Sequence, residues 1–413
     1  MRQTLFYIPH EISGIPFLGF GWLLGIWCLL GAVIIYLAWK QQGWSKETLA
    51  QFPVLILVGA AIVYVLPNVE ERVPATGAIL GLPIRGYGAM VLLAVISGVS
   101  LAVYRAGRCG VSADTIFGLA FAMFVPGIVG ARLFYIIQYW HEIHVAGDLM
   151  ATMSQMVNLV KGGLVVYGSL IGGLVGFAYF MWRNKLPALA IGDLIAPSMA
   201  LGLAIGRVGC LMNGCCYGGV CETGVASNWA VTFPADSPPY QDQQSNGLFH
   251  GLRFEEFSSG VHIAEITDSN IIENTPLAAG QAVIEINGHT IRTLNDVRIV
   301  LMQSGPDISI TTNIGTVPLV AAAPFPVRSK PVHPTQIYSS INALLICCFG
   351  LAVYPYRSRD GQVLAAVLTV YAITRFVLEL IRIDEAHFQS TGLTISQNVS
   401  VIMLIGLVAL WLY

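Results

Sequence analysis

Three arginines lie inside long apolar stretches of this sequence, where a permanent positive charge is costly. Arg132, Arg207 and Arg375 lie within 117–137, 194–212 and 363–381, respectively. A guanidinium at the centre of a bilayer costs about 2.5–3.5 kcal/mol on insertion scales, and it cannot lose its proton to become neutral. Glu379 is the one acidic residue well inside the same stretches. The charges therefore favour an external anion as their partner, and a lipid phosphate fits.

Glu379 also belongs to a charged group on one predicted helix. Arg375 and Glu379 are four residues apart, and Glu379 and Arg382 are three apart, so the three side chains share a helix face. A buried ion pair that joins helices is an open alternative for Glu379. It does not explain Arg375 equally well, because one carboxylate cannot neutralise three or four arginines.

Arg207 stands in the densest polar motif of the chain, Gly-Arg-Val-Gly-Cys-Leu-Met-Asn at 206–213. An apolar helix is predicted to end there in a glycine-rich polar turn. Arg207 precedes Asn213 by about a turn and a half, which places both on nearly the same face. The pair could clamp a lipid headgroup. The alternative is a helix-packing motif with an internally paired arginine.

Two further motifs stand at predicted membrane boundaries. A glycine-rich run at 161–173 carries a single phenol, Tyr167, which we expect to point into the protein. His333, Gln336 and Tyr338 form a polar segment where the chain re-enters the membrane. A lone histidine before proline is more often structural than catalytic.

Composition identifies the class of protein. The 413 residues are 55% hydrophobic and 11% charged, and the mean hydropathy is +0.69. These values predict a polytopic membrane protein, and no basic run suggests a nucleic-acid partner. We expect about nine membrane spans, at 17–39, 53–67, 86–104, 115–139, 163–182, 190–213, 335–355, 362–381 and 397–413. The second is short enough to be re-entrant.

Short basic loops predict the orientation. Lysines and arginines concentrate at 40–46, 105–108, 183–185 and 357–359. These loops fall on one face, which is cytoplasmic by the positive-inside rule. The N-terminus, which lacks the features of a removed signal peptide, is then outside and the C-terminus inside. The polar stretch 214–334 is also outside.

Within that stretch, 251–320 is predicted to form a small α+β domain. Strands are expected at 261–266, 282–286 and 308–312, and a helix at 294–302. Asn287 and Gly288 are expected to form a turn, and Asn295-Asp296 to open the helix. The run 275–301 resembles the second half of a PDZ domain, a fold that often binds extended peptides by strand addition. A passive spacer is the favoured alternative.

Four cysteines, Cys210, Cys215, Cys216 and Cys221, lie close together in the sequence. Their spacing lacks the paired C-x-x-C pattern of structural zinc sites, so no metal is predicted. A Cys216–Cys221 disulfide stays open, and small buried side chains are the favoured interpretation.

Taken in order, these motifs resemble the prolipoprotein diacylglyceryl transferase family. The resemblance covers roughly 78–215 and 333–385 and includes 81–88, 130–135 and 229–234. The Gly-Arg-x-Gly-x-x-x-Asn-Gly element, followed by His-Pro-Thr-Gln-x-Tyr and Arg-x-x-x-Glu, is specific. It implies an enzyme that moves the diacylglyceryl group of phosphatidylglycerol to the lipobox cysteine of a preprolipoprotein and releases glycerol phosphate.

The resemblance also implies roles for individual residues. The family's two essential arginines fall on Arg207 and Arg375, with Tyr167 and Glu379 as further catalytic candidates. The substrate-binding candidates are Tyr87, Arg132, Arg207, Asn213, His333, Gln336, Tyr338 and Arg382. Three departures stand out: Tyr167 replaces the family's usual histidine, Cys210 and Cys215 replace positions that are often Asn and Glu, and two segments are extra to the common plan. The base that activates the thiol is therefore open.

The complete prediction is an all-α polytopic membrane protein, N-out and C-in, with a PDZ-like extracytoplasmic insert. Its parts are an extra membrane segment (1–75), a transferase core in two parts (76–220 and 333–413) and the external region (221–332). No cofactor is expected. The partners are phosphatidylglycerol, lipobox-bearing preprolipoproteins, membrane lipid and, at the insert, an extended peptide. We expect the bacterial cytoplasmic membrane, with the site facing outward. The alternative is a transporter or binding protein for an anionic lipid.

Overall fold

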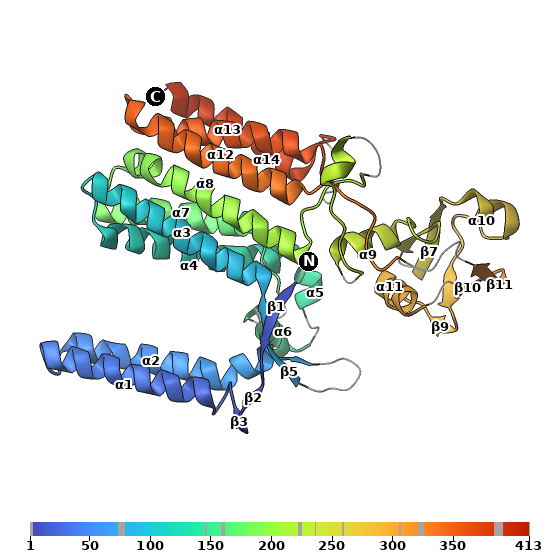
Figure 1. Cartoon of the computed structure of the whole chain (residues 1–413), viewed down its shortest axis with the longest axis horizontal. Coiled ribbons are helices and arrows are strands. Elements are labelled where there is room, and N and C mark those ends of the chain that lie inside the picture. The colour runs from blue at the N-terminus through green and yellow to red at the C-terminus, as the bar shows by residue number, and fades with distance from the viewer. Residues whose placement is uncertain are drawn as a thin grey trace. The chain divides into compact units, whose positions relative to one another are not determined.

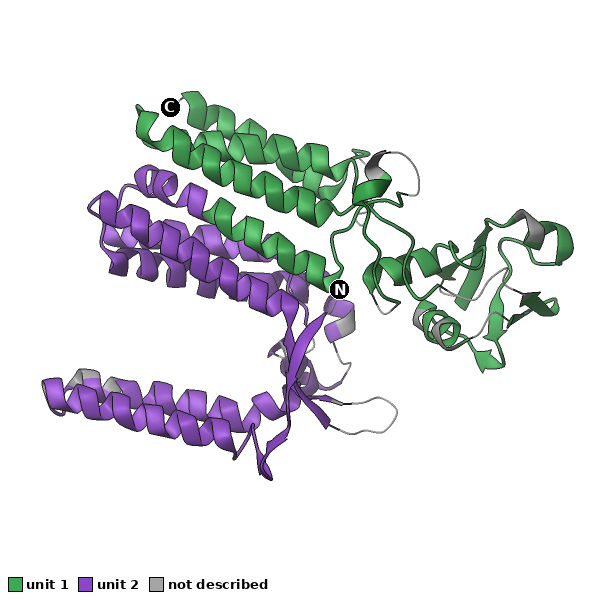
Figure 2. Cartoon of the chain, viewed as in Figure 1, with its two compact units in different colours: residues 1, 199–413 green, residues 2–198 purple. Residues whose placement is uncertain are grey.

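A computed structural model of the whole chain describes residues 3–72, 79–144, 147–157, 162–221, 225–235, 237–257, 260–304, 307–320, 326–383 and 391–412. The chain divides into two compact units (Figure 2). Residues 2–198 form one, called here the N-terminal unit. Residues 199–413, with residue 1, form the other, called the C-terminal unit. Helix α8 contributes to both.

Helices occupy all nine positions at which the sequence predicts a span. They are α1 (Trp22–Gln42), α2 (Lys46–Tyr64), α3 (Gly86–Arg108), α4 (Ala113–Gln138), α7 (Val166–Asn184), α8 (Ala188–Asn213), α12 (Thr335–Val353), α13 (Gln362–Glu379) and α14 (Ile395–Leu412). Seven helices in the described residues are long and apolar enough to cross a membrane. The apolar part of α2, Gln51–Tyr64, is shorter, and α7 is not among the seven. The prediction of a mostly helical, polytopic membrane protein is confirmed, and the count of nine stays a prediction.

The N-terminal unit begins with a strand that pairs with the strand directly before α3. Strand β1 (Thr4–Ile8) pairs with β5 (Ile79–Arg85), and β5 also pairs with β4 (Glu71–Arg72). The Gly86 amide, at the first residue of α3, donates to the carbonyl of Gln3 at 2.9 Å. Between these strands α1 and α2 form a hairpin, joined by a 3.0 Å bond from the Trp27 indole to the Leu55 carbonyl. The sheet therefore fixes where α3 begins.

Glycines bring α4 and α7 into backbone contact. A Cβ at Gly130 would lie 2.3 Å from the carbonyl oxygen of Gly168, and one at Gly168 would lie 2.2 Å from that of Gly130. One turn on, a Cβ at Gly172 would lie 2.1 Å from the Pro126 oxygen. Only glycine permits such an approach, because any side chain would enter the opposite backbone. This close packing positions the first turn of α7.

The membrane part of the C-terminal unit consists of the end of α8 and the helices α12, α13 and α14. Helix α13 packs against both α12 and α14 (Figure 1). Polar side chains join them inside the apolar environment. Ser340 donates to the Ala204 carbonyl at 2.8 Å, and the Asn342 amide donates to Thr374 at 2.9 Å. Interhelical hydrogen bonds of this kind help membrane helices to associate.

The insert between α8 and α12 forms the small α+β region that the sequence predicts. Its elements are β6 (Leu252–Phe257), β7 (Gly260–Ile266), α10 (Ser269–Asn274), β8 (Val283–Ile286), β9 (His289–Thr290), α11 (Leu294–Gln303), β10 (Asp307–Thr312) and β11 (Gly315–Val320). The strands form a sheet in the order β11-β10-β8-β9 and a separate β6-β7 hairpin. Buried residues of these elements make one core, which includes Leu252, Ile263, Ile286, Leu301 and Ile310.

Two local features of the insert test the sequence interpretation. Asn287 and Gly288 both have positive φ, 51° and 77°, and close the β8-β9 turn as expected. The start of α11 differs from the prediction. Thr293, not Asn295, is the N-cap, and Asp296 completes a capping box with it. Thr293 has the extended backbone of a cap residue, which places Asp296 at the third helical position, where its carboxylate reaches back to the free amides. The PDZ-like identity stays a prediction.

The remaining elements are short and lie outside the nine long helices. They are β2 (Glu11–Ile12), β3 (Ile15–Pro16), η1 (Leu66–Val69), α5 (Trp140–Ile143), α6 (Leu149–Val157), η2 (Val225–Trp229), α9 (Pro238–Ser245) and η3 (Tyr354–Tyr356).

Candidate active site

A network of ion pairs lies at the C-terminal end of α13. One carboxylate oxygen of Glu379, Oε2, lies 2.7 Å from Nη1 of Arg375 and 3.5 Å from Nη1 of Arg382. The Glu379 side chain has no exposed surface, and that of Arg382 is 5% exposed. The prediction that the three residues share one face is therefore confirmed. Arg382 follows the last helical residue, but its amide bonds to the Glu379 carbonyl and continues the turn.

The next helix contributes to the same network. Nη2 of Arg375 donates to Oγ of Ser396, in the first turn of α14, at 2.7 Å. The Arg375 guanidinium is thus held from two directions, by Glu379 on its own helix and by Ser396 on α14. Such contacts restrict a long side chain to a single orientation, which a binding site for a planar or tetrahedral anion requires.

Arg207 and Arg375 line the same small hollow. The two arginines line it together with residues from α8, α12 and α13. The other lining residues are Leu203, Ser339, Asn342, Tyr371 and Leu378. Arg207 makes no ion pair with any carboxylate of the described residues, and its charge is close enough to Arg375 to repel it. Among the described residues, the guanidiniums of Arg207, Arg375 and Arg382 outnumber the single carboxylate of Glu379 and leave an excess of positive charge here.

The segment from His333 to Tyr338 holds the turn that follows α8. The Gln336 amide donates to the Cys215 carbonyl at 2.7 Å, and the Thr335 hydroxyl donates to the Cys216 carbonyl at 2.6 Å. Both side chains are almost completely buried. Gln336, predicted to bind substrate, thus has a supporting contact inside the protein. Its role toward substrate stays a prediction.

His333, Tyr338 and Asn213 lie around the same turn. The Gly218 amide donates to the His333 carbonyl, and the His333 amide donates to the Gly219 carbonyl, both at 3.0 Å. A Cβ at Gly218 would lie 2.7 Å from that of His333, so glycine is required for this approach. The rings of His333 and Tyr338 are 6.4 Å apart. Asn213 is the last residue of α8 and is half-buried.

Three cysteine thiols gather at this turn. The sulfur atoms of Cys210, Cys215 and Cys216 all lie within 4.8 Å of one another. Hydrogen bonds from the thiols of Cys210 and Cys215, and then the charges of Arg382 and Arg207, lower the pKa of the Cys216 thiol. Hydrogen bonding to Cys210 and Cys216, with burial, raises the pKa of Cys215. Cys216 and Cys221 both carry free thiols, so the structure does not contain the disulfide that the sequence left open.

Arg132, in the N-terminal unit, is bound by backbone carbonyl groups. Its guanidinium donates to the carbonyls of Gln155, Met156, Gly162 and Gly163 at 2.6–2.9 Å. It also lies over the Tyr135 ring, 5.1 Å from the centroid. An external anion is therefore not needed to satisfy this arginine. Substrate contact by Arg132 remains a prediction.

The two tyrosines predicted for the site also belong to the N-terminal unit. Tyr167 lies in the first turn of α7 and is half-buried. Tyr87 lies in the first turn of α3, and 46% of its surface is exposed. The structure thus brings eight predicted residues together in the C-terminal unit and places three in the N-terminal unit: Tyr87, Arg132 and Tyr167.

Comparison with known proteins identifies the family. The family model of the prolipoprotein diacylglyceryl transferases matches residues 74–413. The chain belongs to this family. Residues 1–73 lie outside the match, which agrees with the extra N-terminal segment expected at 1–75.

Known members of the transferase family align at different lengths. The phosphatidylglycerol–prolipoprotein diacylglyceryl transferase of Rhodopirellula baltica is 33% identical over 98% of this chain and 87% of its own length. Transferase 2 of Clostridium perfringens is 31% identical over 58% of this chain and 91% of its own length. The Psychrobacter arcticus transferase is 24% identical over 82% of this chain and 92% of its own length. This transferase is therefore longer than the Clostridium relative, whereas the Rhodopirellula relative aligns with nearly all of it.

Sequence reasoning missed several polar residues of this transferase site. Ser396 contacts Arg375, whereas Ser339, Asn342 and Tyr371 line the hollow. The only available signal was that they are polar positions inside or beside apolar spans, because a buried polar group in a membrane helix needs a partner. None has a charge or a distinctive spacing that would have separated it from a helix-packing residue.

Proposed function

We propose that this chain transfers the diacylglyceryl group of phosphatidylglycerol to the lipobox cysteine of a preprolipoprotein. Family membership supports the reaction, because relatives across the family carry that name. The single structural observation that carries the proposal is the hollow between Arg207 and Arg375. Its described residues carry an excess of positive charge inside a membrane protein, which suits the phosphate of an anionic lipid.

In this reaction, Arg207 and Arg375 act on the negative charge of the phosphate that leaves. The cysteine sulfur attacks the glycerol carbon next to the phosphate and forms a carbon–sulfur bond. The carbon–oxygen bond to the phosphate breaks, and glycerol phosphate leaves with the electron pair. Arg207 and Arg375 stabilise the charge on the leaving phosphate, because fixed donors in a site of low dielectric constant need little reorganisation. The thiol proton leaves separately.

The base that removes this proton is open among three residues. Glu379 is already paired with two arginines, which favours its carboxylate as a structural counter-charge. His333 lies beside Tyr338 at the segment that supports the cysteine turn. Tyr167 carries a phenol, which is a weak base unless positive charge lowers its pKa.

The deciding experiment measures transfer of a radiolabelled diacylglyceryl group from phosphatidylglycerol to a lipobox peptide. Wild-type protein should form the thioether and release glycerol phosphate. Arg207→Ala and Arg375→Ala should each abolish transfer, whereas Arg253→Ala, an exposed arginine in the insert, should not. A transporter would move lipid without making either product. A wild-type rate in either arginine variant would refute the site.

We also propose that the protein lies in a bacterial cytoplasmic membrane with the site facing outward. The basic ends of α3 and α7 support this orientation, since Arg105, Arg108 and Arg183 all lie in last turns. A membrane-impermeant thiol reagent on intact spheroplasts should label Glu265→Cys in the insert and should not label Cys109, which caps α3. Labelling of Cys109 alone would reverse the orientation.

For the insert, we propose capture of an extended peptide segment. Strand β6 pairs only with β7 among the described strands, and its Glu256 carboxylate binds the first amide of α11 at 2.8 Å. One edge of β6 is thus unpaired among the described strands, as strand addition would require. Replacing 251–320 with a short linker should raise the KM for a full-length preprolipoprotein and leave that for a short lipobox peptide unchanged. If the replacement leaves the KM for the full-length preprolipoprotein unchanged, the insert is a spacer.

A further inference from the structure

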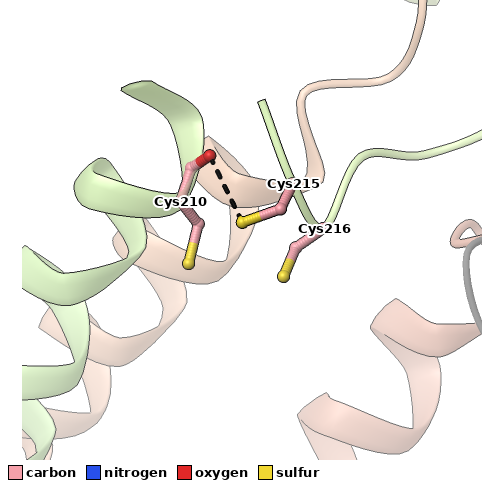
Figure 3. Close-up of side chains that lie close together, drawn as sticks. All are labelled: Cys210, Cys215 and Cys216. Carbon is pink, nitrogen blue, oxygen red and sulfur yellow. Dashed lines mark hydrogen bonds between the residues drawn. The ribbon is translucent and has the colours of Figure 1, made fainter. Parts of the chain in front are cut away.

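The three thiols at the end of α8 form a compact donor group. Cys210 lies in the last turn of the helix, and Cys215 and Cys216 follow in the next turn. Figure 3 shows the three side chains gathered around one space, in agreement with the 4.8 Å limit on their sulfur separations. All three are free and half-buried. The reaction described above assigns them no role.

Backbone geometry and buried hydrogen bonds fix this group in place. Gly214 and Cys216 have φ values of 77° and 61°, and the left-handed region is costly for a residue such as cysteine. The Thr335 and Gln336 side chains hold the carbonyls of Cys216 and Cys215. The amide of Cys215 also bonds to the Cys210 carbonyl at 3.1 Å. The thiols are therefore positioned by both α8 and the first turn of α12.

Three adjacent thiols are a soft donor set. Sulfur ligands favour Zn(II), Cu(I) and iron–sulfur groups over hard cations. A tetrahedral zinc has Zn–S bonds of about 2.3 Å and hence sulfur separations of about 3.8 Å, so a small inward movement of the side chains suffices. Cys221, the next cysteine along the chain, is buried and lies outside the group. Three ligands leave a fourth position open, which is typical of zinc sites that act on a substrate.

The charges around the group favour a metal with three thiolates. Zinc bound by three thiolates has a net charge of about −1. Arg207 lies three residues before Cys210 on α8, and the backbone of Arg382 pairs with that of Gly218, two residues after Cys216. The excess positive charge that suits the lipid phosphate thus also stabilises an anionic metal site. The same turn would bring both reactants near one set of arginines.

We propose that Cys210, Cys215 and Cys216 bind a zinc ion whose fourth position takes the thiol of the substrate cysteine. This proposal rests on the transferase activity proposed above and names the group that activates its nucleophile. Metal coordination is an established way to activate a nucleophile, since a bound thiol is deprotonated outright.

The step is balanced without an oxidant or reductant. The peptide thiol loses its proton to solvent when its sulfur binds. An electron pair of that sulfur then forms the bond to the glycerol carbon, while the carbon–oxygen bond breaks and glycerol phosphate takes the other pair. Zinc keeps its oxidation state. A thioether is a weaker ligand than a thiolate, so the product can leave.

The first test measures metal binding in the full-length protein, purified in detergent under reducing conditions and incubated with zinc. Mass spectrometry of the washed protein should find about one zinc per chain. Cys210→Ser, Cys215→Ser and Cys216→Ser should lose it, and Cys348→Ala, an exposed cysteine of α12, should keep it. Gln336→Leu should weaken zinc binding about 10- to 100-fold, because a supporting contact to a ligating residue is lost. Zinc-free wild-type protein, or binding of copper alone, would overturn the proposal.

The second test asks what takes the fourth position. Cobalt-loaded protein should change its thiolate-to-cobalt absorption when a lipobox peptide is added, and the same peptide with serine in place of cysteine should cause no change. An unchanged spectrum with the cysteine peptide would refute the substrate role. Transfer by zinc-free protein would refute the zinc proposal and leave the transferase intact. Zinc binding with no transfer by the wild-type protein would instead refute the transferase.

Discussion

Arg132 and Arg207 show how one residue type acquires two roles. Arg132 is surrounded by four carbonyl oxygens, two of which come from Gly162 and Gly163. Both glycines have positive φ, and a Cβ at Gly163 would lie 2.6 Å from the guanidinium, so glycine lets the backbone approach. Arg207 instead lies beside a hollow and makes no ion pair with any described carboxylate. Of these two arginines, Arg207 is the one that lies beside the hollow.

At Glu379 the structure predicts a cost in stability when its charge is removed. Glu379→Gln leaves Arg375 and Arg382 buried without their shared counter-charge, and breaking a buried pair from one side costs about 3–5 kcal/mol. The thermal midpoint of the purified protein should fall clearly. Glu265→Gln, which removes an exposed partner of Arg253, serves as the control and should change it little. Equal midpoints for wild type and Glu379→Gln would show that the network does not stabilise the fold.

Among the elements, the α4–α7 contact gives a matched pair of substitutions. A Cβ at Gly172 would lie 2.1 Å from the Pro126 carbonyl oxygen, whereas one at Gly173 would lie 3.8 Å from that of Met123. Gly172→Ala should therefore force the helices apart and lower both the thermal midpoint and the transfer activity, with overpacking worth about 1–3 kcal/mol or more. Gly173→Ala should be tolerated, because alanine is the better helix former. Similar losses in both variants would contradict the contact.

The β6-β7 region of the insert should become less stable in acid. His250 is buried, which lowers its pKa to about 4 from an unfolded value of 6.5. Between these values the unfolded segment binds more protons than the folded one, so stability falls as pH drops through 6.5 and levels off near 4, by about 3 kcal/mol in total. Hydrogen exchange of the β6 and β7 amides, corrected for the intrinsic rate, should be faster at low pH.

The matched variant is His250→Asn, which keeps an acceptor for the Leu252 amide but does not titrate. Its exchange should lose the additional pH dependence. If the variant and the wild type respond to pH in the same way, His250 is not the responsible group.

At the scale of the whole molecule, the insert should be more dispensable than Tyr167. The insert has a hydrophobic core of its own, so replacing 251–320 with a linker should leave the transmembrane helices folded. Tyr167→Phe should lower the transfer rate to a short lipobox peptide more than this replacement does. Tyr179→Phe, an exposed tyrosine on the same helix, is the control. A larger loss from removing the insert would make it part of the catalytic machinery.

The amino-acid sequence by itself determined the helices, the insert and the family. Long apolar stretches have few other stable structures in a membrane, since each backbone polar group must be bonded within the segment. Turn signals such as Asn287-Gly288 worked because few residues adopt positive φ. The pairing of Arg375, Glu379 and Arg382 was also predictable, because the spacing of a helix fixes which side chains meet.

Only the tertiary structure decided which arginine is satisfied and which thiols meet. The carbonyl oxygens around Arg132 come from residues 23–31 positions away, and no local pattern predicts that approach. Thr335 and Gln336 reach the cysteine turn across 119 and 121 positions. Hydrogen bonds of this kind depend on how the chain returns to itself, because any carbonyl can accept them and the sequence does not mark which one will.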